Sequence, residues 1–464
     1  MLVDFSVKNW RSFKDEATLS MVASAERHHK EHLHIQKLGN RELRLLPLAM
    51  IYGGNATGKS NIFKAMEFLK NFVAFGSTQP ASQINVSPFR LDPVSITSPV
   101  AFTVRVMKEQ TLYLYEVLMT RSEIVSERLS IISGSRAKEL YSREGQGFTI
   151  GAELVKRERE ARRQNGNAEL KSTFFDFLTQ SVRPNVLFLT AAVMQNVACL
   201  HPLYSWFSND LMLVSPGTAY APTPVTAKNE EDHESEVFRM MLSRLDSGIE
   251  DIAFTELPFD QLLEQVPVPQ QIKEQVTTDL LGNGSQVRGA VFNVAGEFYK
   301  VRVKDGQLIA GKMVTRHRGH DGSLVPFEVK DESDGTRRMM EIIPAFQWLT
   351  MPGAERTIFF DEIDRSLHPT LVKNLLRFFL ERRDNCQQSQ MLLTTHDVYQ
   401  IDQGVVRRDE LWITDRDRNG ASSLYSFSDY CDLEKQLRSD LDLRKFYMSG
   451  RLGGIPNITL SDIE

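Results

Sequence analysis

Cysteine is scarce in this chain, with three residues among 464 and no pair in a CxxC arrangement. Because Cys199, Cys386 and Cys431 stand far apart, the sequence predicts neither a disulfide framework nor a cysteine-based zinc site. A biased composition is absent as well, since 41% of the residues are hydrophobic and 25% are charged, as in ordinary globular proteins. A chain of this length buries a large core without cross-links.

Long apolar runs and a large charge excess are also missing. The longest candidate for a membrane span, residues 186–200, is shorter than the roughly 18 residues that a helix needs to cross a bilayer. The first residues lack a basic stretch followed by an apolar one, so no signal peptide is expected. The net charge of −5 does not favour nucleic acid as a partner, but it leaves room for a local basic groove. We therefore expect a cytoplasmic protein without a membrane segment.

The distribution of apolar residues predicts a split α/β domain with a helical insert. Alternating residues at 2–7 and within 100–150 indicate antiparallel strands. Apolar residues within 60–72 recur at helical spacing. Near Glu153 the pattern changes to dense mixed charge and then to mostly helical spacing. These changes predict an N-terminal part at 1–152, a mainly helical insert at 153–285 and a C-terminal part at 286–464.

A glycine-rich loop stands between a predicted strand and a predicted helix. Residues 53–60 read GGNATGKS, which fits the pattern G-x-x-x-x-G-K-[ST]. Glycines in this context let successive backbone N–H groups face an anion at the start of a helix. We expect Lys59 to reach the β- and γ-phosphates of ATP and the Ser60 hydroxyl to ligate Mg²⁺. Further nucleotide contacts are expected from Gly53, Asn55 and Gly58.

Two adjacent carboxylates end a second buried strand. The apolar run 357–360 precedes Asp361 and Glu362, and alternation along a strand sends these side chains to different sides. Asp361 is expected in the Mg²⁺ shell, and Glu362 is expected to polarise the water that attacks the γ-phosphorus. A further strand, 391–395, ends at His396, which is expected to hydrogen-bond the γ-phosphate. Each of these features alone would also fit a polar strand end.

Together these residues resemble the ABC-type ATPase heads of the SMC, RecF and OLD superfamily. The order is similar: an N-terminal strand with Asn9-Trp10-Arg11-Ser12-Phe13, the phosphate loop continuing into Asn61, a long insert, and a signature segment before the acidic pair. Residues 332–338, ESDGTRR, occupy the signature position and depart from the LSGGQ of transporters. In this departure the chain resembles a prokaryotic defence-associated subgroup, with RloA, AbiL-type ATPases and the ATPase subunits of PARIS and Septu systems.

The resemblance implies an ABC-ATPase head with a mixed central sheet, an antiparallel β subdomain and the insert. Two heads would dimerise head to tail around two ATP molecules. Ser333, Gly335 and Thr336 of one chain would then act on the nucleotide of the other, at a helix N-terminus that favours the γ-phosphate. Arg11 and Asn61 would join the nucleotide contacts of their own chain.

The subgroup implies an anti-phage role for this ATPase. It would be a sensor and scaffold that restrains and releases a separately encoded toxic effector, such as a nuclease, in response to a phage protein. The dimer would be able to build a higher oligomer. The alternative is a RecF-like or SMC-like repair ATPase that clamps DNA directly, for which the charged run 156–163 is one candidate contact. A transporter subunit fits less well, because the signature departs from LSGGQ.

A histidine cluster offers nitrogen ligands for a metal ion. Zinc or nickel would suit such ligands, but no carboxylate or cysteine pattern accompanies them, so a solvated loop is expected instead. The cluster consists of His28, His29, His32 and His34.

An Asp-x-Asp pair follows a strand near the end of the sequence. Asp415 and Asp417 mimic a motif of the Toprim nuclease that OLD proteins carry after their ATPase head. However, Asn419-Gly420 is a strong hairpin signal, and alternating residues resume at Ser423. We therefore expect Asp415 and Asp417 to be turn residues.

Overall fold

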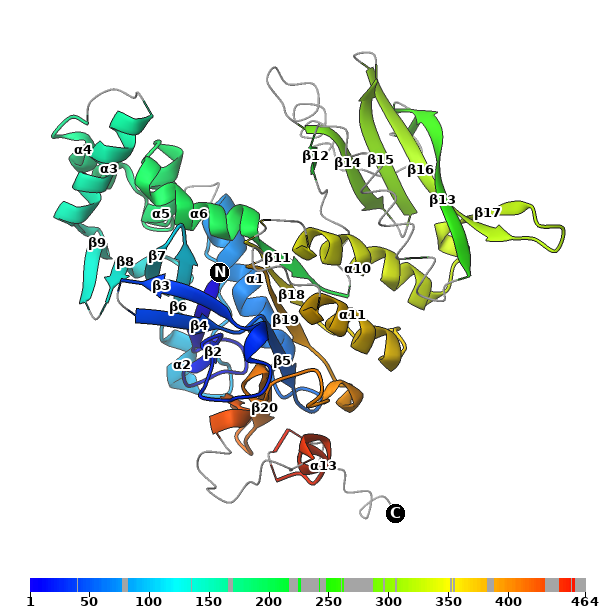
Figure 1. The fold of residues 1–464 in the computed structure, drawn as a ribbon. Coiled ribbons are helices and arrows are strands. Elements are labelled where there is room, and N and C mark those ends of the chain that lie inside the picture. The colour runs from blue at the N-terminus through cyan, green and yellow to red at the C-terminus, as the bar shows by residue number, and fades with distance from the viewer. Residues whose placement is uncertain are drawn as a thin grey trace. The chain divides into compact units, whose positions relative to one another are not determined.

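The computed structural model divides the chain into two compact units, which we describe separately (Figure 1). Unit 1 comprises Met1–Val214, Pro352–Ile363 and Leu376–Glu464, and unit 2 comprises Ser215–Met351 and Asp364–Leu375. These divisions differ from the boundaries expected at 152 and 285. The structure describes residues 1–39, 41–76, 82–134, 136–165, 170–216, 224–226, 242, 248–259, 261–262, 287–294, 297–304, 307–350, 353, 355–381, 388–429, 442–451 and 453–454.

The central sheet of unit 1 is mixed. In the order given at the end of this paragraph, the first five strands run parallel to one another, and the sixth is antiparallel to the fifth. Three of them, β18, β19 and β5, are buried along their whole length, which explains their unbroken apolar sequences. The order across the sheet is β11 (Leu211–Val214), β18 (Thr357–Phe360), β19 (Gln390–Thr394), β5 (Leu48–Tyr52), β20 (Leu411–Arg416) and β21 (Ser422–Ser426).

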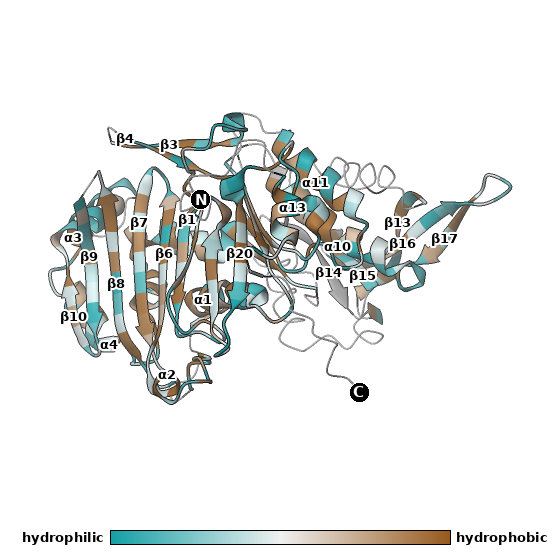
Figure 2. Ribbon diagram, turned by 90° about the horizontal axis from the view of Figure 1, so that it is seen from below, coloured by the Kyte–Doolittle hydropathy of each residue, from teal (hydrophilic) through white to brown (hydrophobic). Residues whose placement is uncertain are grey.

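An antiparallel sheet of seven strands forms the second layer of unit 1, and Figure 2 shows β9, β8, β7 and β6 side by side in it. Inward residues of β6 and β7 alternate with partly exposed ones, as the sequence pattern predicted. The fold class of an α/β protein with a mixed sheet and an antiparallel β subdomain is thus confirmed. The order is β10 (Gly147–Ile150), β9 (Arg136–Glu144), β8 (Ile124–Ser133), β7 (Thr111–Met119), β6 (Val100–Lys108), β1 (Leu2–Lys8) and β2 (Ala17–Ser20).

The core of unit 1 joins the two sheets through helix α1 (Lys59–Phe75). Buried positions along α1 include Ile62, Met66, Leu69 and Val73, at the helical spacing seen in the sequence. Unit 1 also contains α2 (Pro93–Thr97), α13 (Leu443–Met448), the hairpin β3 (His34–Leu38) and β4 (Arg41–Leu45), and the short helices η1 (Lys30–His32), η2 (Ala198–Leu200), η3 (Trp206–Asp210), η5 (Val398–Gln400) and η6 (Arg408–Glu410).

The segment expected as a helical insert is helical only in part. Its first residues form α3 (Ala152–Gln164), α4 (Phe174–Ser181), α5 (Phe188–Met194) and α6 (His201–Ser205), all within unit 1. The helical prediction is wrong at β11, where four apolar residues pair with β18, and at β13 (Ile249–Pro258), which pairs with β16. Runs this short and this mixed do not distinguish strand from helix until the pairing partner is known.

Unit 2 contains an antiparallel sheet and the helix that follows it. Strands β12 (Pro224–Thr226), β14 (Val287–Val294), β15 (Glu297–Lys304), β16 (Gln307–Arg318) and β13 lie in that order, and β17 (Leu324–Glu328) pairs with β16. The short η4 (Val329–Asp331) leads to α10 (Asp334–Thr350), and α11 (Pro369–Glu381) begins in this unit. Among the described residues, none of the helices is both long and apolar enough to cross a membrane.

Candidate functional site

The phosphate loop follows β5 and packs against the β20–β21 hairpin. Gly53 and Gly58 have φ of 154° and 117°, a region that favours glycine. A Cβ on Gly53 would lie 2.3 Å from Thr414 Oγ1, and a Cβ on Gly58 would lie 2.7 Å from Ser422 Oγ. Thr57 fixes the turn, since its hydroxyl donates to the Gly54 carbonyl at 2.9 Å and bonds Thr414 Oγ1 at 2.7 Å. Both glycines are therefore required by space as well as by backbone conformation.

Lys59 lies at the first position of α1 and is buried. Its Nζ donates hydrogen bonds to the carbonyls of Gly53 and Gly54, at 2.7 and 2.9 Å. The same Nζ is 3.3 Å from Nδ1 of His396, which follows β19. The ammonium group thus stands at the mouth of the loop, where an anion held by the loop would meet it. The structure brings Lys59 and His396 together, as their predicted roles require.

Three side chains converge where β18 and β19 end. Ser60 Oγ donates to Asp361 Oδ1 at 3.0 Å, so the two expected Mg²⁺ ligands are already in contact. Thr394 Oγ1 donates to the same Oδ1 at 2.6 Å and accepts the Glu362 N–H at 2.8 Å. Hydroxyl and carboxylate oxygens are the hard ligands that Mg²⁺ prefers, so this donor set fits that ion. Thr394 was not foreseen, because a threonine at a strand end carries no motif.

Glu362 has a left-handed backbone with φ of 49°, which is costly for a residue with a side chain. Ala56 and Arg11 share this feature, with φ of 62° and 50°. All three residues line the same cavity, and so does His396. Strained backbone persists where the surrounding structure holds it in place, and three such residues meet at this cavity. Asp361 bonds Ser60 and Thr394, whereas Glu362 lines the cavity.

The cavity has a volume of about 700 Å³, which lies in the range of small-molecule sites. Arg11 reaches its rim, and the Arg11 N–H donates to the Ser87 carbonyl at 2.7 Å. Burial lowers the pKa of Arg11 and the Glu67 carboxylate opposes that shift. The lining residues are Arg11, Ser12, Asn55, Ala56, Thr57, Gly58, Lys59, Ser60, Asn61, Ser87, Pro88, Phe89, Arg90, Leu91, Glu362, His396, Arg416 and Gly420.

Asn61 has a structural partner as well as a place on the cavity wall. Its Nδ2 donates to Ser12 Oγ at 2.7 Å, and its carbonyl accepts the Trp10 indole N–H at 3.0 Å. Asn61 therefore holds the segment that carries Arg11 against α1. Two cations on the wall, Arg90 and Arg416, were not predicted, since only the packing of loops around the cavity brings them there.

The predicted signature residues lie at the N-terminus of α10 in unit 2. Ser333 Oγ accepts the backbone N–H of Thr336 at 3.1 Å and is 2.9 Å from Thr336 Oγ1, so it caps the helix. A Cβ on Gly335 would lie 2.9 Å from the Ser366 carbonyl oxygen, in the segment after the acidic pair. The helix N-terminus and that segment therefore pack closely within unit 2.

The prediction of turn residues is correct for Asp417 and wrong for Asp415, which lies within β20 and pairs with Ser423 of β21. Asp417 Oδ1 accepts the Ala421 N–H at 2.7 Å, and the Gly420 N–H donates to the Asp417 carbonyl at 3.1 Å. Asp415 Oδ1 accepts the Gly454 N–H at 3.0 Å. These carboxylates are engaged with the backbone of the turn and of the segment near residue 454.

Comparison with known proteins gives the chain its family. No curated protein matches it. Among solved structures, an SMC head bound to the C-winged helix domain of ScpA aligns at 12% identity and a TM-score of 0.39, over 92% of this chain and 99% of that one. The SMC head domain from Thermotoga maritima aligns at 11% identity and a TM-score of 0.32, over 92% and 98%. Residues 48–402, well over half of the chain, match the model of a family described as "AAA domain, putative AbiEii toxin, Type IV TA system", and the chain belongs to that family.

Proposed function

We propose that the protein binds ATP with Mg²⁺ in the cavity of unit 1 and hydrolyses it to ADP and phosphate. The observation that carries this proposal is the convergence of Lys59, Ser60, Glu362 and His396 on one cavity. Asp361 joins them through its hydrogen bond with Ser60. Bound there, Mg²⁺ would neutralise phosphate charge and orient the γ-phosphoryl group. Ser60 and Asp361 would hold it, as their contact supports.

Three side chains of this protein perform the other steps of the reaction. Lys59 binds the phosphates and stabilises the charge that develops on them. Glu362 positions the attacking water and accepts its proton, and its held backbone aims the carboxylate into the cavity. His396, next to Lys59 Nζ, is placed to donate a hydrogen bond to the terminal phosphate.

Two variants test the ATPase proposal separately for binding and for chemistry. Lys59→Ala is expected to lose affinity for a fluorescent ATP analogue, because the main cationic phosphate contact is removed. Glu362→Gln is expected to keep that affinity but to release phosphate at least about 100-fold more slowly, since the water loses its base. Retained affinity in the first variant, or normal turnover in the second, would contradict the assigned roles.

For the biological role, we propose an anti-phage sensor and scaffold that controls a separately encoded toxic effector in an ATP-dependent way. The family description, with its toxin–antitoxin context, supports a defence setting. The engagement of Asp415 and Asp417 in a hairpin counts against a nuclease centre at that Asp-x-Asp pair.

Affinity purification of the Glu362→Gln protein from its native host, with ATP and Mg²⁺ present, tests this role. A stoichiometric protein partner with little nucleic acid would support the effector proposal and identify what the ATPase controls. Nucleic acid without a protein partner would instead support a RecF-like clamp on DNA. A Lys59→Ala control, which should not bind ATP, identifies the partners that depend on the nucleotide.

A further inference from the structure

The loop between β2 and β3 of unit 1 gathers three potential metal ligands. His29 precedes the single turn η1, which contains Glu31 and His32. One ligand atom from each of the three side chains lies within 4.8 Å of the others. The expectation that no carboxylate accompanies the histidines is wrong, because the turn places Glu31 beside both imidazoles. His34 lies elsewhere, with Nε2 against the Ser389 carbonyl at 3.0 Å.

The tautomer of His29 leaves a nitrogen facing the carboxylate. His29 Nε2 is 3.0 Å from the carbonyl oxygen of Gln403. A carbonyl only accepts hydrogen bonds, so Nε2 carries the hydrogen and Nδ1 of the neutral ring keeps its lone pair. Metal-binding histidines usually donate their second N–H to a carbonyl or a carboxylate in this way. His29 therefore has the outer hydrogen bond that a ligating histidine needs.

The spacing of the first two ligand atoms suits a tetrahedral ion. His29 Nδ1 and Glu31 Oε1 are 3.4 Å apart, longer than a charge-assisted hydrogen bond of about 2.7–2.9 Å. Zinc bonds of roughly 2.0–2.1 Å at tetrahedral angles place two ligand atoms about 3.3–3.4 Å apart. The Glu31 side chain is 70% exposed, so water can reach the site as a further ligand. The separation thus matches an ion between the two groups.

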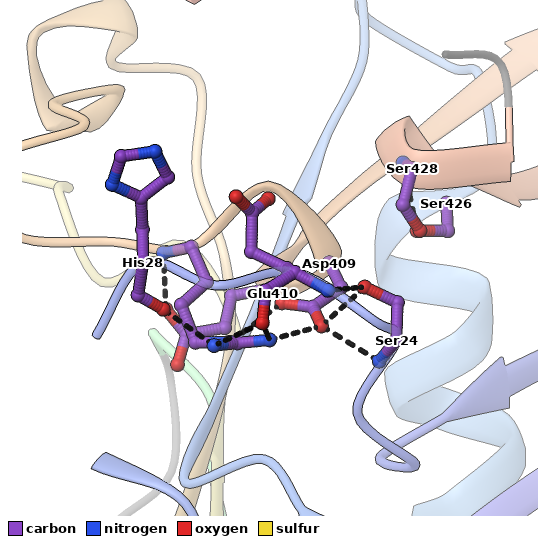
Figure 3. A network of polar contacts seen from close by, with 8 residues as sticks. Ser24, His28, Asp409, Glu410, Ser426 and Ser428 are labelled. Atoms are coloured by element: carbon purple, nitrogen blue, oxygen red, sulfur yellow. Dashed lines mark hydrogen bonds and ion pairs between the residues drawn. The ribbon is translucent and has the colours of Figure 1, made fainter. Parts of the chain in front are cut away.

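A buried network fixes the backbone that leads to His29. The Arg407 side chain is fully buried and pairs with the Asp409 carboxylate at 2.7 and 2.9 Å. Its guanidinium also donates to the His28 carbonyl, while Asp409 Oδ2 accepts the N–H and the hydroxyl of Ser24, each at 2.8 Å. Figure 3 shows these contacts, with the His28 ring pointing away from them. His29 keeps a left-handed backbone, φ 50°, immediately after this anchor.

We propose that His29, Glu31 and His32 bind a divalent transition-metal ion, with zinc as the best fit and water completing the tetrahedron. The rings of His29 and His32 are stacked, 4.9 Å between centroids and 7° between planes. Two parallel rings cannot aim their lone pairs at one ion, so binding turns the His32 ring out of the stack. The site therefore differs from the Mg²⁺ site in its ligands, since nitrogen donors favour zinc, nickel and copper over magnesium.

Untagged protein stripped of metal and titrated with Zn²⁺ in the absence of nucleotide tests the site. We expect calorimetry to show that each chain binds one equivalent of Zn²⁺ with high affinity. When Co²⁺ replaces Zn²⁺, we expect the absorption spectrum of a tetrahedral cobalt site. His29→Gln and His32→Gln should each lower the affinity for this Zn²⁺ ion by about 10–100-fold. His28→Gln is the matched control on the same loop, and Asp361→Asn controls for the separate Mg²⁺ site; both should bind as the wild type does.

Several outcomes would overturn the proposal. These are no tight equivalent in the wild type, loss of binding in His28→Gln or Asp361→Asn, or unchanged binding in His29→Gln and His32→Gln. Folding is checked by circular dichroism, and zinc should raise the Tm of the wild type and His28→Gln but much less that of His29→Gln. The Glu31→Gln variant gives a second test, because it keeps both rings and should lose affinity without disturbing the loop.

Discussion

At the scale of single residues, Thr394 contacts both acidic residues of the candidate site through one hydroxyl. It donates to Asp361 and accepts the backbone N–H of Glu362. We expect Thr394→Val, which keeps the shape of the side chain, to lower kcat. It should also raise the Mg²⁺ concentration needed for half-maximal activity by about 10–100-fold. The KM for ATP should change little, because Lys59 and the loop are untouched.

A serine at the same position supplies the control for that prediction. Thr394→Ser retains the hydroxyl and should recover most of the activity and the normal Mg²⁺ requirement. Steady-state ATPase assays over a range of Mg²⁺ concentrations measure both variants. A valine variant with wild-type Mg²⁺ dependence would show that Asp361 needs no such support.

The site residues that carry a motif were predictable, and those that carry none were not. Lys59 meets His396 and Ser60 meets Asp361, because the ends of parallel strands and the loop after β5 share one edge of the sheet. Thr394 and the two arginines of the cavity wall depend on register and on loop packing, which short sequence patterns do not encode. Glu31 was overlooked although it stands between two of the histidines.

At the scale of elements, helix α5 is joined to the antiparallel sheet by one buried carboxylate. Glu127 Oε1 accepts from the hydroxyls of Tyr115 and Tyr141 at 2.9 and 2.8 Å, and Oε2 accepts the Phe188 N–H at 2.6 Å. Burial raises the pKa of Glu127, and the backbone N–H of Leu189 and that of Phe188 oppose the shift. The carboxylate thus satisfies the first N–H groups of α5, which would otherwise be buried without partners.

Removing this carboxylate should destabilise unit 1. Glu127→Ala leaves several buried donors without an acceptor, and we expect a loss of about 3–5 kcal/mol in the free energy of unfolding. Glu123→Ala, four positions earlier and exposed, should change it by less than about 0.5 kcal/mol. Chemical denaturation followed by circular dichroism compares the two, and equal midpoints would contradict the assignment.

Elements with a regular pattern were predicted better than short ones. Strands β6 and β7 alternate because one face is buried, and Asn419-Gly420 marked the β20–β21 hairpin. β11 and β13 were missed, since β11 has four residues and β13 alternates weakly. Both form strands because they pair with distant segments of the sequence, β11 with β18 and β13 with β16. A local sequence pattern does not identify such pairing partners.

At the scale of the whole molecule, the head-to-tail dimer that the resemblance implies would divide each active site between two chains. The phosphate loop lies in unit 1 and Ser333 in unit 2, and the proposal pairs one chain's loop with the other chain's serine. A mixture of Lys59→Ala and Ser333→Arg chains should then recover activity that neither variant has alone. Random pairing makes half of the dimers mixed, each with one intact site, so about a quarter of wild-type activity is expected.

The same mixture distinguishes a site shared between chains from a site within one chain. If the serine serves the loop of its own chain, no pairing creates an intact site and the mixture stays inactive. A mixture of Lys59→Ala with Glu362→Gln is the control, because both residues belong to the part of the site that the chain with the phosphate loop contributes. That mixture should remain inactive in either case.

The hydroxyl pair Thr57–Thr414 joins two residues 357 positions apart. The segment that defines the family ends at residue 402, before the strand that carries Thr414 and the cavity residue Arg416. Arg11 likewise precedes the start of that segment, residue 48. An excised fragment of residues 48–402 would therefore contain the phosphate loop, both acidic residues and His396 and still lack the strand that closes the loop. We therefore expect nucleotide binding to need more of the chain than the diagnostic motifs, and truncated proteins should retain at least β1 through β21.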